Sequence, residues 1–191
     1  MARSNNHGHS ERCEGSRRFN SAAVTTIAIL RDAQDDKSRQ IMKIIPITNA
    51  VGEIIELEWL RQSESVFRQL RPHLPTDFVG RMKEVFATGA EMAACVVDGN
   101  VRGITVFRVF EKTFSGRELY CDDLVTDETA RSTGVGRTMI AYMESIAAQR
   151  GCDTLALDSG CQRQQAHKFY FREGLTIPAF RFSKPVKKSA S

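Results

Sequence analysis

"DDLVTDETARSTGVGRTMIAYM", residues 122–143, is the stretch that decides the fold of this chain of 191 residues. An apolar, strand-like segment passes through two glycines and then into a segment with helical apolar spacing. The first amides of a helix lack partners within the helix, and the helix dipole makes that end positive. Arg131, Gly134 and Gly136 form an R-x-x-G-x-G pattern at this junction, which suits a diphosphate. A plain tight turn is the alternative interpretation.

The segments on either side of this junction predict an α/β fold. Apolar periodicity and turn residues indicate strands at 43–48, 91–97, 101–110, 117–127, 152–159 and 175–185. Helices are expected at about 55–74, at 77–88 after a cap at Thr76, at 137–150 and at 162–174. The order β-α-α-β-β-β-α-β-α-β predicts a mixed, partly antiparallel central sheet flanked by helices.

The composition divides the chain into three regions. Residues 1–41 are polar and poorly periodic, which predicts a disordered N-terminal extension. The compact domain is expected at 42–185, followed by a basic tail at 186–191. Four of the 27 basic residues lie between Gly174 and Ser191, so the rest of the chain carries 23 basic and 23 acidic residues. This balance argues against a nucleic-acid ligand.

The cysteines and apolar runs predict a cytoplasmic protein. The five cysteines are odd in number and include no CxxC pair, so we expect reduced thiols, no disulfide framework and no metal site. The early apolar run 22–30 is too short for a membrane span and is followed by "RDAQDD" rather than a cleavage motif. We therefore expect no membrane partner.

A second motif, "LALDSGCQRQQAHKFYFREGL" at 155–175, gives the first one a more specific meaning. Taken together, the two stretches resemble the acetyl-CoA signature and the closing motif of the GNAT superfamily of N-acetyltransferases. The resemblance covers about 43–185, and the expected order of elements matches that family. It implies the GNAT fold and acetyl-CoA as co-substrate.

The resemblance also implies which residues hold the co-substrate. Backbone amides of 131–136 would bind the pyrophosphate, and the strand edge at 124–126 would pair with the pantetheine arm, where the strand splays from its neighbour at 155–159. The implied residues are Leu124, Val125, Thr126, Arg131, Ser132, Thr133, Gly134, Val135, Gly136 and Arg137. One departure is Arg163, where many members carry an asparagine. An arginine there could reach a phosphate instead.

Acyl transfer to an amine needs a base for the amine and an acid for the departing thiolate. The resemblance places the acid at Tyr170, although an aromatic run at 169–171 is also typical of a core. Asp122 and Asp123 are candidates for the base. Because successive strand side chains face opposite ways, we expect only one to point into the site, and we favour Asp122. A structural role for both carboxylates is the alternative.

The sequence thus predicts an N-acetyltransferase that moves an acetyl group from acetyl-CoA to a primary amine in a ternary complex. The alternative is a non-catalytic acyl-CoA-binding regulatory module. The acceptor could be a small-molecule amine or a protein amine, and a homodimer is compatible with the sequence. Arg68, Arg71 and His73 could recognise an acidic acceptor or form a solvated helix end. We expect Cys121 and Cys161 to be bystanders.

Overall fold

A computed structural model describes residues 42–186. In chain order the elements are β1 (Met42–Pro46), α1 (Leu57–Gln62), α2 (Glu64–Leu70), α3 (Phe78–Phe86), β2 (Glu91–Val97), β3 (Asn100–Lys112), β4 (Gly116–Thr126), the 3-10 turn η1 (Glu128–Ala130), α4 (Val135–Gln149), β5 (Thr154–Leu157) and α5 (Gln164–Arg172). The extension at 1–41 and the tail at 187–191 lie outside the described residues, so the calls made on them stay predictions.

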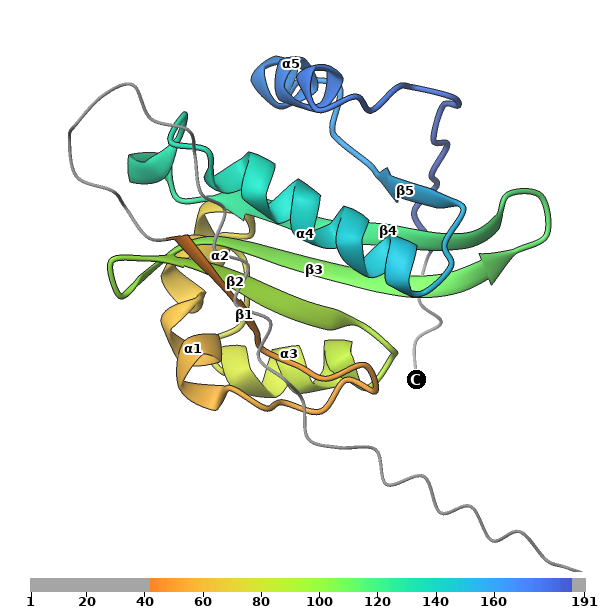
Figure 1. The fold of residues 1–191 in the computed structure, drawn as a ribbon. Coiled ribbons are helices and arrows are strands. Elements are labelled where there is room, and N and C mark those ends of the chain that lie inside the picture. Colours follow the sequence, from red (N-terminus) through yellow and green to blue (C-terminus); the bar gives the residue numbers. More distant parts are fainter. Residues whose placement is uncertain (1–41, 187–191) are drawn as a thin grey trace, which may run out of the picture.

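The five strands form one sheet in the order β1-β2-β3-β4-β5. The first four strands pair antiparallel, and β5 runs parallel to β4. This arrangement is the mixed, partly antiparallel sheet that the sequence predicts. Helices α1–α3 cover one face of the sheet and α4 covers the other, while α5 lies beyond β5 (Figure 1).

Each face of the sheet has its own apolar core, because strand side chains alternate between the two faces. In β1, Ile45 packs with the core under α1–α3, and its neighbour Ile44 packs with the core under α4. The buried α4 side includes Met139, Ile140 and Met143. Burial on both faces explains why β2 reads as a continuous apolar run.

The predicted long first helix is two short helices in the structure. The helix is interrupted at Ser63. This residue is fully buried, and its hydroxyl donates a hydrogen bond to the Trp59 carbonyl oxygen at 2.7 Å. Such back-bonding competes with the regular helix ladder. The cap of α3 is Asp77, which accepts from the Gly80 amide at 2.8 Å, and not Thr76 as predicted.

The predicted closing strand at 175–185 is wrong: within the described residues, nothing after Leu157 is a strand. Pro178 lacks an amide donor, and Arg181 is held instead by Tyr120 and Asp158. Ile177, Phe180 and Phe182 are therefore exposed. The edge strand β5 is only partly covered.

None of the helices within 42–186 combines the length and the apolar character that crossing a bilayer requires.

Candidate active site

A β-bulge brings two carboxylates to the same side of the sheet. Val106 of β3 lies opposite Asp123, and Phe107 lies opposite Cys121, so Asp122 is an extra residue without a partner in the register. A bulge of this kind interrupts the alternation of side chains. Asp122 and Asp123 consequently line one cavity, which corrects the expectation that only one of them would point inward.

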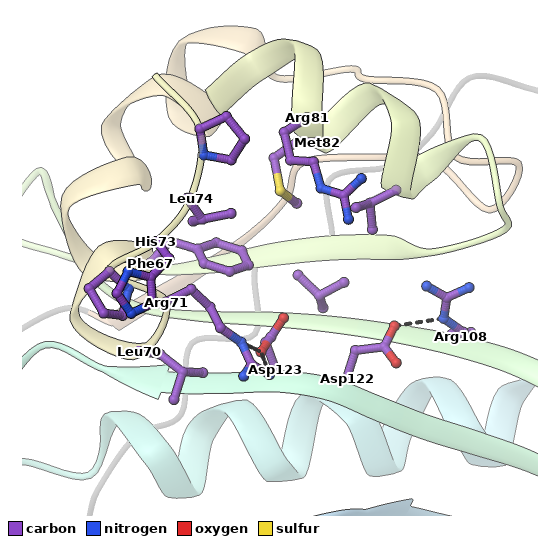
Figure 2. Close-up of a pocket in the computed structure, with 14 residues that line it drawn as sticks. Phe67, Leu70, Arg71, His73, Leu74, Arg81, Met82, Arg108, Asp122 and Asp123 are labelled. Carbon is purple, nitrogen blue, oxygen red and sulfur yellow. Dashed lines mark hydrogen bonds and ion pairs between the residues drawn. The ribbon is translucent and has the colours of Figure 1, made fainter. Parts of the chain in front are cut away.

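Each of these carboxylates is held by an arginine from a different element (Figure 2). Arg108 Nε on β3 donates to Asp122 Oδ2 at 2.6 Å. Arg71, which follows α2, places its Nη2 2.6 Å from Asp123 Oδ1. Burial raises the pKa of Asp123 above its ordinary value, although the Arg71 guanidinium opposes this rise. A raised pKa makes Asp123 a stronger base than an exposed aspartate.

Two hollows meet at these residues. The larger cavity, of about 530 Å³, lies between β3–β4 and the segment from α2 to α3. The smaller one, of about 100 Å³, lies between β4, the loop after β5 and α5. They share Leu70, Arg71, Asp122 and Asp123. A molecule in the larger cavity could therefore meet a group in the smaller one across the carboxylates.

Tyr170 on α5 lines the smaller cavity. Burial raises the pKa of its hydroxyl, helped by nearby Cys121 and opposed by Arg163. The hydroxyl is therefore protonated at neutral pH and can act as a donor. Burial also raises the pKa of the Cys121 thiol to about 12, which keeps it protonated and fits the expectation of a bystander.

The aromatic side chains on either side of Tyr170 lie in different environments. Phe169 packs on the core under α4, and Phe171 is exposed. A β-carbon on Gly136 would lie only 3.0 Å from Phe169 Cζ, so this glycine allows α5 to approach α4 closely. His167, one turn from Tyr170, bonds through Nε2 to the Gly160 carbonyl oxygen at 3.0 Å.

The glycine junction is a left-handed turn that opens α4. Gly134 is the N-cap of α4 with φ of 98°, and Ser132 also has a positive φ of 63°. No side chain caps this helix end, so its first amides are free to bind an anion. Thr133 Oγ1 bonds to the Ala130 carbonyl oxygen at 2.7 Å. Arg137 pairs with Glu173, the C-cap of α5, so its side chain ties α4 to the end of α5.

The strand edge beside this turn is open toward β5. The pairing of β4 with β5 ends at Cys121, whereas β4 itself continues to Thr126. Leu124, Val125 and Thr126 are paired on their other side with β3. The two parallel strands thus separate after Cys121 and Leu157, while β4 continues toward the glycine turn (Figure 1). An extended ligand could add to this edge as a further strand.

Residues 53–174 match the profile of the "Acetyltransferase (GNAT) family". The chain belongs to this family. This match confirms the family resemblance that we drew from the two sequence motifs. The predicted fold class is also confirmed, except that the expected closing strand is missing from the described residues.

Two curated relatives are N-acetyltransferases by name. An uncharacterized N-acetyltransferase, YhdJ, of Bacillus subtilis (strain 168) is 40% identical over 72 residues, which is 37% of this chain and 51% of the relative. The aminoalkylphosphonate N-acetyltransferase of Salmonella typhimurium (strain LT2) is 36% identical over 64 residues, covering 34% and 42%. The chain therefore spans about half the length of these relatives or less.

A solved structure of the aminoglycoside N-acetyltransferase AAC(6')-Iy in complex with CoA shares the GNAT fold. Its TM-score is 0.67 with 16% identity, covering 80% of this chain and 98% of the other. At this identity the likeness concerns the fold alone.

Two residues of this GNAT site could not be assigned from the sequence. Arg108 is one, since its pairing with Asp122 depends on strand register. Ser159 is another, since its buried hydroxyl lines the smaller cavity and has no hydrogen-bond partner within 42–186.

Arg163, the departure from the family pattern, also lines the smaller cavity. Arg68 is held by Glu64 and by the carbonyls of Leu74 and Pro75, so it fixes the α2–α3 segment.

Proposed function

We propose that the protein is an acetyl-CoA-dependent N-acetyltransferase that acts on a primary amine in a ternary complex. The observation that carries this proposal is the junction of two cavities at Asp122 and Asp123. One cavity adjoins the open β4 edge and Tyr170, where the thioester would lie. The other is large enough for a small acceptor.

The glycine turn fits the pyrophosphate of acetyl-CoA. Its positive φ at Gly134 and its uncapped helix start present amides to an anion, as a phosphate site requires. We assign the cofactor contacts to backbone amides of Arg131–Gly136 and to the edge at Leu124, Val125 and Thr126. The side chain of Arg137 is paired with Glu173. We therefore assign only the backbone of Arg137 to the cofactor site.

In the proposed reaction, Asp123 accepts a proton from the acceptor ammonium group, which leaves the nitrogen with a free electron pair. The nitrogen attacks the thioester carbonyl carbon, forming the C–N bond while the C–S bond breaks. Tyr170 donates its proton to the leaving thiolate. The attacking nitrogen loses a second proton and Tyr170 regains one from solvent, so the products are an amide, CoA and one net proton. Asp122, held by Arg108, orders the acceptor or a water molecule.

The names of relatives support this proposal. One relative acts on aminoalkylphosphonates and another, similar in fold only, was solved with CoA. A small-molecule amine is therefore the acceptor we favour. A protein amine is the alternative acceptor.

The direct test is acetyl-CoA binding by calorimetry, with desulfo-CoA and ATP as controls, followed by release of CoA in the presence of amines. We expect binding that depends on the pyrophosphate and turnover with at least one amine. Binding without turnover on any amine would favour the regulatory module. Absence of binding would overturn the proposed function.

A further inference from the structure

The charges around the larger cavity, here called the acceptor pocket, indicate what kind of amine it takes. This step rests on the proposed function. Four side chains that carry or can carry positive charge line the pocket, namely Arg71, His73, Arg81 and Arg108. Asp122 and Asp123 are the only carboxylates among the described residues that line it.

Both carboxylates already have a cationic partner. Arg108 neutralises Asp122, and Arg71 neutralises Asp123, each at 2.6 Å. The charge that remains on the pocket wall is therefore positive and comes from Arg81 and, when protonated, His73. A polycationic acceptor would meet this excess charge without a free carboxylate to balance it.

The two ends of the pocket differ. The reacting amine has to lie at the border with the smaller cavity, beside Asp122 and Asp123, because Tyr170 and the open β4 edge are on that side. Arg81 lies at the other end. It projects from α3 into the pocket, on the side opposite to β4 (Figure 2).

Arg81 is available to a ligand in this position. Its side chain is 48% exposed, and its partner within 42–186 is Glu84, at 2.9 Å on the same helix. Glu84 is 70% exposed and does not line the pocket. Exposed i,i+3 pairs of this kind contribute little free energy, so an anionic ligand can compete for the guanidinium.

Much of the remaining pocket lining is apolar. It includes Phe67, Leu74, Met82, Val85 and Val106. A hydrocarbon segment would lie well against these side chains, while a heavily hydroxylated one would leave its hydroxyl groups without partners there.

We propose that the acceptor is a primary amine joined by a short aliphatic segment to an oxyanion group, a carboxylate or a phosphonate or phosphate. The amine end lies at Asp122 and Asp123, and the oxyanion end binds Arg81. Arg81 is thus the residue that selects the substrate class.

A matched series of amines that share a chain of three methylene groups tests this proposal. The series is 3-aminopropylphosphonate, 4-aminobutyrate, 3-aminopropanol and 1,3-diaminopropane, with CoA release as the readout. We expect kcat/KM for at least one of the two anionic amines to exceed that for the alcohol by about tenfold, as a charge-assisted contact predicts, with the diamine poorest. The ratio of the two anionic amines distinguishes a phosphonate from a carboxylate preference. Equal or better turnover of the alcohol or the diamine would overturn the proposal.

Arg81→Gln is the decisive variant. It should raise KM for the anionic amine by about five- to tenfold more than it raises KM for the alcohol, with KM for acetyl-CoA as the reference for an intact co-substrate site. Arg61→Gln is the matched control, because Arg61 also forms an exposed i,i+3 pair, with Glu58, but lies on α1 outside the pocket. The same KM increase in both variants, or in neither, would contradict the role of Arg81.

A binding measurement separates this inference from the proposed function. Calorimetry of 3-aminopropylphosphonate and 4-aminobutyrate against the protein–CoA complex should detect binding of at least one of them, and Arg81→Gln should weaken it. If that binding is present but no acetyl transfer occurs, the pocket assignment stands and the enzyme proposal fails. If transfer occurs with neutral amines and neither anionic amine binds, the enzyme proposal stands and this inference fails.

Discussion

At the scale of single residues, the site depends on how two neighbouring aspartates differ. Both are paired to arginine, but burial raises the pKa of Asp123, and its side chain is 13% exposed against 27% for Asp122. A base must be deprotonated to act, so activity falls as the pH drops through this raised pKa. The sequence-based preference for Asp122 rested on strict alternation, which the bulge removes.

We predict that the pH profile of kcat/KM loses activity on the acid side at a higher pH than an ordinary aspartate would allow. Asp123→Asn should abolish most of the activity and remove this limb. Asp122→Asn is the control and should lower kcat/KM while keeping the limb. An acid limb that persists in Asp123→Asn would assign the base to another group.

Tyr170 can be tested as the proton donor in the same way. Tyr170→Phe should lower kcat by roughly a hundredfold, the lower end of the range of general acid catalysis, without changing the Kd of CoA. Tyr142→Phe provides the control, because Tyr142 is a buried tyrosine of α4 that lines neither cavity. Unchanged kcat in Tyr170→Phe would remove this residue from the mechanism.

At the scale of elements, helix α4 matters through its first turn. Gly134 opens the helix with φ of 98°, and Gly151 follows its last turn with φ of 65°. The two glycines therefore impose similar backbone strain on any replacement but lie at opposite ends of one helix.

We predict that Gly134→Ala and Gly151→Ala each lower the free energy of unfolding by about 1 kcal/mol, the usual cost of a left-handed conformation in a non-glycine residue. Gly134→Ala should in addition weaken CoA binding, measured by calorimetry, because it moves the amides that face the pyrophosphate. Equal CoA affinity in the two variants would show that the turn does not bind the co-substrate.

At the scale of the whole molecule, the first strand of the sheet marks where the described fold begins. β1 begins at Met42 and pairs with β2 along its whole length, and Ile44 and Ile45 enter the two cores. A chain that begins at Met42 thus keeps every described contact.

We predict that residues 42–191 alone retain the Tm and the CoA affinity of the full chain, by thermal unfolding and calorimetry. Removal of residues 1–46 is the comparison. It should lower Tm strongly, since it deletes an edge strand and buried isoleucines. A lower Tm for residues 42–191 would mean that the extension packs on the domain.

Local features were predictable from the sequence because short-range physics produces them. Apolar periodicity located β2 exactly and α4 to within two residues, and the glycine pattern at 131–136 marked the start of α4. The closing strand at 175–185 was wrong because a strand needs a neighbouring strand, which no local pattern guarantees.

The sequence by itself determined the order of elements from β1 to α5, apart from the division of the first helix, together with the glycine turn and the candidate acid and bases. Only the tertiary structure decided that Asp122 and Asp123 share one pocket, that Arg71 and Arg108 neutralise them, and that Arg81 lies across from them. The reason is that these relations depend on strand register and on the packing of α2 and α3 against the sheet. Arg71 and Asp123, for example, are 52 residues apart in the chain. Contacts over such distances follow from the packing of the whole fold and leave no local signal in the sequence.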